Sequence, residues 1–524
     1  MAAAALLAAG CSRCGKEPIT RAASVERVLP TGAAAYVIVP SLERLGQKLT
    51  LFEGLKVANF AAQAAAFENA HAYVDTMVNE LGIDLRSKEQ LDRIGVASDA
   101  SAGVALMDDE GAAVMALPIK DEGRIGAFIR TYSANRLGAS AVEDKVENGV
   151  TVHRLMAASG PRLAWASSNG YALIVPRGAV DKLAGWASRA EADTLAKDSS
   201  LPASLARLPT ERDAVIYAPP GTRQMLALPV SHVVLALSLT PQAFTLTVDA
   251  PWGGGKEALA LFEPKASPSL LGRLPADAFL VARFTGEAAE LGRLAKPLLG
   301  KNLQRAFDEG GFDLDAALGQ VAPGAMVALS LAPTAQMGGG VSDLDFRRTN
   351  PFAYVHLSGV APAKAPEAVG PALEKLASVA PKFGAQMTLK DGVYVTTWAQ
   401  GEGVHFAARD GQVVFGSPLP RVTALLSPEA GGGAVPSLEG SLDSSALAVV
   451  VDLRTLSDAV RALPPSAWGI GGFAIKATTL RWLDNSDDLK AVTVNVGAKG
   501  GAVQGTVKLL LGAPAQASGG DAGP

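Results

Sequence analysis

Two cysteines are the residues whose type and spacing first suggest chemistry. Cys11 and Cys14 form a C-S-R-C sequence near the N-terminus, and the 524-residue chain contains no other cysteine. A CxxC pair is typical of a redox-active dithiol at a helix start, or of half a zinc site that needs further ligands. Neither context surrounds this pair, so we expect neither chemistry. The rest of the chain has no cysteine for a disulfide, a thiolate metal site or a nucleophile.

Histidine is the next residue type that could bind a metal or transfer a proton. The chain has five histidines, and none lies in an HExxH motif or another close ligand spacing. Four fall in segments with strand-like alternation and one falls in a helical segment, so we predict ordinary structural positions for all of them. The strand histidines are His153, His232, His356 and His405, and the helical one is His71.

Three aspartates lie close together in the sequence LDNSDDLKA: Asp484, Asp487 and Asp488. Carboxylates at short spacing can hold calcium. The segment lacks the glycine and the distal glutamate of a calcium loop, however. We therefore predict an acidic turn between two strands and no metal site.

A second charged cluster lies in the sequence SDLDFRRTN, within a segment that has no counterpart elsewhere in the chain. We predict an exposed loop, because mixed charge runs are usually solvated. If a partner binds a loop of this protein, this is the first candidate. Its charged residues are Asp343, Asp345, Arg347 and Arg348.

Motifs for nucleophilic catalysis and phosphate binding are also missing. No GxSxG is present, and VFGSPLP lacks the second glycine and has Pro418 after the serine. WGGGKEA does not meet the spacing of a P-loop. The chain carries 47 Lys and Arg against 51 Asp and Glu, without the basic clusters that nucleic-acid binding requires. We expect no catalytic residues, no cofactor, no metal and no nucleic-acid partner, and therefore no enzyme.

The N-terminal sequence MAAAALLAAGC resembles a bacterial lipoprotein signal. Small residues precede Cys11, which would be the lipidated mature N-terminus, although no basic residue comes before it and Ala8 stands where leucine is usual. The prediction is a signal peptide at 1–10 and a flexible tether at 11–24. Ser12 favours the outer membrane of the bacterial cell envelope, facing the periplasm or the exterior. The alternative is an alanine-rich start of a cytosolic protein. No later apolar run approaches the roughly 20 residues of a membrane span.

An internal duplication organises the rest of the chain. LPTGAAAYVIVPSLERL from Leu29 matches LPADAFLVARFTGEAAEL from Leu274, and both predict a strand followed by an amphipathic helix. Asn-Gly or Asp-Gly pairs then mark two hairpins in each half, which makes the sheets antiparallel. The positions of these turns are Asn148-Gly149 and Asn169-Gly170 in the first half, and Asp391-Gly392 and Asp410-Gly411 in the second.

The predicted fold class is α+β, with two homologous domains that each have helices packed on one side of an antiparallel sheet. The domains are expected at 25–255 and 265–512, with a linker at 256–264 and a disordered tail at 513–524. Two local predictions belong to this scheme. TTLRWLDN is expected to be a closing strand, and FAAQAAAFENAHAYVDTMVNEL a long helical stretch that packs in a core or offers a groove to an apolar body.

The LPADA-type strand opening, the paired halves and the lipoprotein-like start resemble an uncharacterised family of bacterial envelope proteins of unknown function. This resemblance implies no active site. We expect a lipid-anchored envelope protein that acts by binding or scaffolding. Two alternatives stay open: a periplasmic carrier of lipid or another apolar ligand, and an enzyme built from scattered residues.

Overall fold

The computed structural model divides the chain into two units. It describes residues 24–107, 112–221, 229–267, 269–288, 301–333, 335, 350–427, 445–468 and 472–512. Met1–Phe52 and His71–Met225 belong to the first unit, while Glu53–Ala70 and Leu226–Pro524 belong to the second. The predicted signal peptide, Cys11, nearly all of the tether, the charged loop cluster and the tail lie outside the described residues. Among the described residues, no helix has both the length and the apolarity to cross a membrane.

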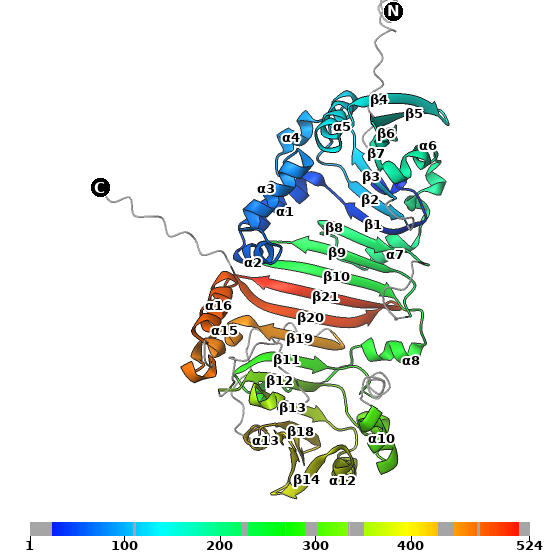
Figure 1. Ribbon diagram of the computed structural model, residues 1–524. Coiled ribbons are helices and arrows are strands. Elements are labelled where there is room, and N and C mark those ends of the chain that lie inside the picture. The colour runs from blue at the N-terminus through cyan, green and yellow to red at the C-terminus, as the bar shows by residue number, and fades with distance from the viewer. Residues whose placement is uncertain are drawn as a thin grey trace, which may run out of the picture. The chain divides into compact units, whose positions relative to one another are not determined.

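The first unit contains an antiparallel sheet whose neighbouring strands follow the order β8-β1-β2-β3-β7-β6-β5-β4. The strands are β1 (Ala33–Val39), β2 (Ala102–Met107), β3 (Ala113–Pro118), β4 (Ala141–Glu147), β5 (Val150–Ala157), β6 (Gly160–Ser168), β7 (Tyr171–Pro176) and β8 (Ala214–Ala218). Its helices include α1 (Leu42–Glu53, of which Glu53 is assigned to the second unit), α3 (Ala70–Leu81, beginning one residue before the boundary), α4 (Lys88–Arg93), α5 (Glu122–Leu137), α6 (Leu183–Ala187) and α7 (Ser200–Leu205). Figure 1 labels these elements.

The second unit contains a longer antiparallel series in the order β9-β10-β21-β20-β19-β11-β12-β13-β18-β17-β15-β14, with β16 also paired to β15. The strands are β9 (Val233–Leu239), β10 (Ala243–Pro251), β11 (Ala278–Phe284), β12 (Ala325–Leu331), β13 (Val355–Pro362), β14 (Ala385–Lys390), β15 (Val393–Trp398), β16 (Gly401–Glu402), β17 (His405–Arg409), β18 (Gln412–Ser417), β19 (Leu447–Asp452), β20 (Leu489–Lys499) and β21 (Ala502–Leu511).

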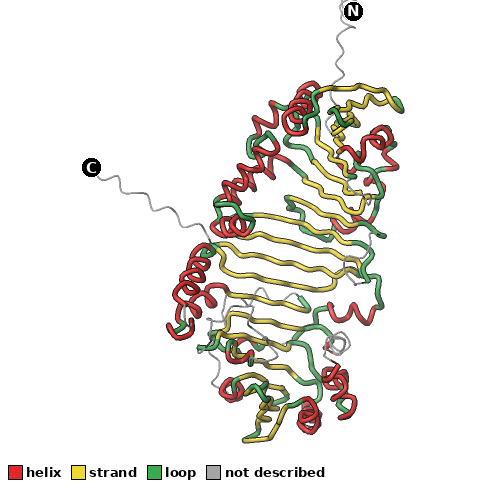
Figure 2. Tube along the Cα trace, viewed as in Figure 1, coloured by secondary structure: helices red, strands yellow, loops and turns green. Residues whose placement is uncertain are grey.

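Helices border the strands of the second unit as well, as the red and yellow tube of Figure 2 shows. They include α2 (Lys56–Ala64), α8 (Lys256–Leu259), α10 (Lys301–Gly310), α11 (Leu314–Gly319), α12 (Pro366–Val379), α13 (Leu419–Leu426), α15 (Leu453–Ala462) and α16 (Gly472–Asn485). The predicted α+β class with antiparallel sheets is therefore confirmed.

The strand order of the first unit recurs inside the second. The two orders correspond strand for strand, and every pair of neighbouring strands in the first has its counterpart in the second. The first order is β8-β1-β2-β3-β7-β6-β5-β4, and the second is β19-β11-β12-β13-β18-β17-β15-β14. A bulge interrupts the pairing between Ala33 and Ala35 in β1, and another interrupts it between Ala278 and Leu280 in β11. Each bulge begins four residues after the leucine of its Leu-Pro sequence.

The Asn-Gly and Asp-Gly pairs form the predicted hairpin turns. Asn148, Asn169, Asp391 and Asp410 all have φ between 48° and 52°, and the glycine after each also has positive φ. Two consecutive residues with positive φ make the tight turn that matches the twist of antiparallel strands. The pairings β4–β5, β6–β7, β14–β15 and β17–β18 follow from these turns.

Two predicted elements are wrong. TTLRWLDN lies in helix α16 and is no strand. Leu480 and Leu483, one helical turn apart, join the hydrophobic cluster of Val460 and Trp468, so tertiary packing favours a helical period. The apolar stretch from Phe60 is not one continuous helix. Helix α2 ends at Ala64, and α3 begins at Ala70.

Candidate apolar ligand site

One face of the first sheet carries an unbroken row of side chains from neighbouring strands. Val37 of β1 pairs with Val104 of β2, Val104 with Met115 of β3, and Met115 with Ile174 of β7. Side chains opposite one another across strands lie on the same face. The row therefore forms an apolar floor about four strands wide.

Helices α1, α3, α4 and α5 supply the wall opposite this floor. Leu42 of α1, Leu81 of α3, Leu91 of α4 and Ile129 of α5 line the same cavity as the floor residues. Leu42, Leu91 and Ile129 are at most 6% exposed, so this wall belongs to the core of the unit.

Close contacts hold α5 and α3 in place. A Cβ added to Gly126 of α5 would lie 2.9 Å from the Trp165 ring. The glycine therefore lets α5 approach β6 more closely than a residue with a side chain would. Asp121 caps α5 by accepting a hydrogen bond from Arg124 N at 3.1 Å. Arg136, in the last turn of α5, donates a hydrogen bond to the carbonyl of Asn79 in the last turn of α3.

Between floor and wall lies a cavity of about 380 Å³. Within the described part of the chain, its lining has no charged side chain, and Tyr132 contributes the one hydroxyl. Leu81 and Met115 line the cavity and are 39% and 38% exposed, so it opens to solvent beside them. Ligand sites of small molecules typically span 300–1,000 Å³ and are mostly apolar.

The lining residues are spread along one direction of the sheet. They extend across five neighbouring strands, from Val37 on β1 to Leu163 on β6. At about 4.8 Å per strand this distance is about 19 Å. A volume of about 380 Å³ spread over that length leaves a mean cross-section of about 20 Å², close to one strand spacing squared. Such a slot suits an extended chain better than a fused ring system.

Beyond Ile174, the row of paired side chains continues with Trp165 and His153. Trp165 of β6 pairs with Ile174, and His153 of β5 pairs with Trp165. The His153 and Trp165 rings stack with centroids 4.3 Å apart, and His153 Nδ1 lies 2.7 Å from Asp144 Oδ1. These contacts hold His153 in the sheet as predicted.

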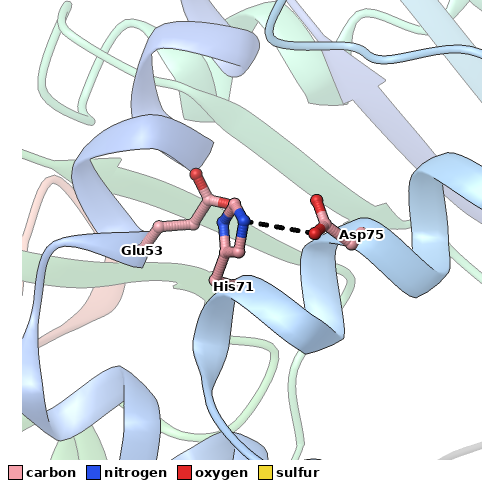
Figure 3. A group of neighbouring side chains, drawn as sticks. All are labelled: Glu53, His71 and Asp75. Atoms are coloured by element: carbon pink, nitrogen blue, oxygen red, sulfur yellow. Dashed lines mark ion pairs between the residues drawn. The ribbon is translucent and has the colours of Figure 1, made fainter.

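His71 lies on helix α3, as predicted, and is exposed. Its Nε2 lies 3.2 Å from Asp75 Oδ2 one turn along the same helix (Figure 3). Arg86 approaches the other oxygen of Asp75 at 3.3 Å, so this carboxylate already has a cationic neighbour. Glu53, also drawn in Figure 3, belongs to the second unit. Two ligands on one helix do not make a metal site.

The other three histidines belong to the second unit. His405 on β17 is fully buried; its Nδ1 accepts a hydrogen bond from Thr396 N, and its Nε2 lies 3.0 Å from Glu402 Oε1. His356 lies on β13 beside Arg421. His232 is buried one residue before β9, a small departure from the predicted strand position.

The three clustered aspartates do not form a turn between strands, because Asp484 lies on α16 and only Asp487 and Asp488 follow this helix. Asp484 on α16 pairs with Arg461 at 2.6 Å. Asp488 accepts hydrogen bonds from Lys56 N at 2.7 Å and Val57 N at 3.2 Å, and Asp487 pairs with the Lys56 ammonium at 2.8 Å. Asp488 thus caps the N-terminus of α2, and Asp487 pairs with the side chain of its first residue, Lys56. Asp343, Asp345, Arg347 and Arg348 lie outside the described residues.

The corresponding row of the second unit differs at its centre. Ala282, Val327, Gly359 and Phe415 pair in sequence across β11, β12, β13 and β18. A Cβ on Gly359 would lie 2.2 Å from the Phe415 ring, so the ring covers the glycine. In the first unit the pair at this place is Met115 and Ile174, both of which line the cavity.

Comparison with known proteins adds little to this geometry. No family model matches the chain, and no curated protein matches it. Solved structures titled "Structure of crystal form I of TP0453" and "Structure of crystal form III of TP0453" are similar at 10% identity and a TM-score of 0.26. They cover 44% and 46% of this chain, and 80% and 82% of their own. No argument rests on a likeness of that size.

Sequence reasoning did not single out the cavity residues, although Leu81 lies in the helical stretch that was expected to pack in a core or offer a groove. Their apolar types are those of any core, and strand alternation identifies the face on which they lie but not whether helices fill it. The length of this helical stretch was one available signal of the cavity.

Proposed function

We propose that the protein binds a single extended hydrocarbon chain, such as the acyl chain of a lipid, in the apolar cavity of its first unit. One observation carries the proposal: an open, uncharged slot of about 380 Å³ between floor and helices. The carrier hypothesis is therefore preferred to scaffolding, which no particular surface of the described residues supports.

The energetics favour an occupied cavity. Because the cavity opens to solvent, part of its apolar lining is exposed to water when no ligand is bound. A hydrocarbon guest is favoured by about 0.8 kcal/mol for each CH₂ that it buries there.

We further propose that the protein is anchored in the bacterial cell envelope through a lipid on Cys11, and that its body arose by duplication at about 25–255 and 265–512. The lipoprotein-like sequence before Cys11 supports the anchor. The recurring strand order and the matching bulges after Leu29 and Leu274 support the duplication. An anchored carrier would present its cavity to lipids of the envelope while staying attached.

The first experiment extracts the purified full-length protein with organic solvent and identifies the released molecules by mass spectrometry. It then titrates the delipidated protein with cis-parinaric acid, a fluorescent chain whose emission rises in an apolar cavity. We expect about one mole of chain per mole of protein.

A filled-cavity variant tests the site itself. Val104→Trp places a large ring on the floor and should weaken parinaric acid binding by at least about tenfold, or about 1.4 kcal/mol. Leu106→Trp is the matched control, because Leu106 lies on the same strand and face, is 44% exposed and does not line the cavity. Equal binding by wild type and a folded Val104→Trp protein contradicts the proposal. Absence of both extracted lipid and parinaric acid binding would favour the scaffolding alternative.

A further inference from the structure

A second cavity, of about 580 Å³, lies on the opposite face of the first sheet. Ile38 of β1 lines it, whereas Val37 and Val39 line the apolar cavity. Successive residues of a strand point to opposite faces, so the two cavities are separated by the sheet. The second cavity lies where β1 and β3 end and β2 and β8 begin, and its floor includes the apolar Val215 and Ile119.

Arg212 brings a positive charge to this cavity. Its Nη1 donates a hydrogen bond to the carbonyl of Leu205 at 3.0 Å. The neighbouring carboxylate, Asp213, is buried and pairs with Arg44 at 2.6 Å, so it is engaged elsewhere. Within the part of the chain that the structure describes, no carboxylate forms an ion pair with Arg212. Burial lowers the pKa of its guanidinium, which is the effect of a charge withdrawn from water without a counter-ion.

Glu26 brings a negative charge to the same cavity. It lies on a short 3₁₀ helix, η1 (Val25–Arg27), that contacts β2. Its Oε2 is buried and has no hydrogen-bond partner among the described residues. The nearby hydroxyl of Ser101 is occupied, because it accepts from Val25 N at 3.0 Å and contacts Tyr171 Oη at 3.1 Å.

The remaining charged groups of the lining are committed or exposed. Lys120 pairs with Asp92 at 2.8 Å, and Asp99 lies exposed at the rim. Arg212 and Glu26 therefore bring opposite charges to one cavity. In the described structure they do not form an ion pair with each other. A charge that is partly withdrawn from water without an ionic partner is unfavourable, so both would gain from a ligand that bridges them.

We propose that this cavity binds a zwitterionic ligand, with an oxyanion on the Arg212 guanidinium and an ammonium group on the Glu26 carboxylate. A planar guanidinium suits the paired oxygens of a phosphate. The apolar floor at Ile38 and Val215 accommodates an attached carbon chain. This site goes beyond the proposed function, because it lies on the other face of the sheet and does not depend on the apolar cavity.

Titration calorimetry at pH 7 on the full-length protein tests the two charges separately. The probes are O-phosphoethanolamine, which has both charged groups, and propyl phosphate, which has the oxyanion alone. Arg212→Gln should weaken binding of both probes by at least about tenfold. Glu26→Gln should weaken O-phosphoethanolamine and leave propyl phosphate unchanged or tighter. Arg212→Lys keeps the charge but not the paired donors, and should lie between wild type and Arg212→Gln.

Controls and a third probe complete the test. Arg162→Gln, at an exposed position of β6, should bind as wild type does. Dihexanoyl phosphatidylethanolamine distinguishes the source of the ligand: tighter binding than O-phosphoethanolamine indicates a lipid headgroup, and equal binding a small soluble zwitterion. No binding of either zwitterion, or equal affinities in wild type and folded Arg212→Gln, overturns the proposal. Arg212→Gln should keep parinaric acid binding, so failure here is distinguishable from failure of the acyl-chain proposal.

Discussion

At the scale of single residues, His356 is a half-buried histidine whose pKa is shifted by its surroundings. Its Nδ1 lies 3.2 Å from Arg421 Nη2, and Arg421 also pairs with Asp277 at 2.6 Å. Because a guanidinium only donates, the ring nitrogen facing it must accept and be unprotonated. Burial, and then the positive charge of Arg421, lower the pKa of His356 in the folded protein.

We predict that this histidine makes the protein less stable as the pH falls from 7 to 5. A histidine with a lowered pKa in the folded state binds protons more readily when unfolded, so stability is lost below its ordinary pKa of about 6.5. His356→Gln removes this titratable group. The decrease in the free energy of unfolding between pH 7 and pH 5 should then be smaller by up to about 1 kcal/mol, which is the contribution of one hydrogen bond. Urea denaturation at pH 7, 6 and 5 measures it, with the exposed His71→Gln as control. Parallel wild-type and His356→Gln stability profiles would contradict the prediction.

The sequence predicted the secondary structure around the histidines better than it predicted their interaction partners. His153, His356 and His405 lie in strands and His71 lies on a helix, because hydrophobic alternation identifies local structure. The partner of His356 is 65 residues away. No local pattern encodes such a distance, and for the same reason the presence of Arg212 and Glu26 in one cavity was not predicted.

At the scale of elements, helix α2 shows how a distant residue completes a helix start. The first N–H groups of a helix have no partner within the helix. Those of Lys56 and Val57 donate to Asp488, more than 400 residues later in the chain. A carboxylate at this position also interacts favourably with the helix dipole.

Removing this cap should destabilise the second unit measurably. Asp488→Ala leaves two N–H groups without their acceptor, and we expect a loss of about 1 kcal/mol in the free energy of unfolding. Asp487→Ala is the matched control, because it removes only an ion pair between two side chains that are more than 50% exposed, which is worth little. Chemical denaturation compares both variants with wild type. A larger loss for Asp487→Ala than for Asp488→Ala would show that the cap contributes little.

Two elements were predicted wrongly from the sequence: the segment TTLRWLDN and the stretch that contains α2 and α3. TTLRWLDN contains two threonines and a tryptophan, which favour strands, yet Leu480 and Leu483 pack as a helical pair in the cluster that includes Val460 of α15. The acidic residues after it were therefore read as a turn between strands, whereas they stabilise another helix. The break between α2 and α3 was missed because apolar residues continue through it; there Asn59 Oδ1 accepts from Ala70 N at 2.9 Å.

At the scale of the whole molecule, the two sheets share strand order, hairpin turns and bulge position, but not the filling of their central row. Met115 and Ile174 border a cavity in the first unit, while Phe415 covers Gly359 in the second. If the halves arose by duplication, as we propose, changes at two paired positions separate a row that lines a cavity from a row whose central glycine is covered by a ring. Aligning the halves by their turns locates this pair, but only packing shows which half is open.

The last prediction follows from that difference. Phe415→Ala removes the ring from above Gly359 and should open an apolar space in the second unit. Deleting a buried phenyl ring costs about 3–5 kcal/mol, and the half-buried Phe415 should cost about 2–3 kcal/mol. Because the remaining row consists of aliphatic residues such as Val327 and Ala282, the new space should accept a hydrocarbon chain.

Parinaric acid titration should then rise from about one to about two chains per protein in folded Phe415→Ala. Leu389→Ala, at a 62% exposed position on β14, is the control and should keep the wild-type stoichiometry. In the double variant with Val104→Trp, only the new site should remain, so the stoichiometry should return to about one. A folded Phe415→Ala protein that still binds one chain would mean that the neighbouring elements close over the missing ring. The open slot of the first unit would then depend on its helices α1, α3, α4 and α5, and not on the residues of the central row.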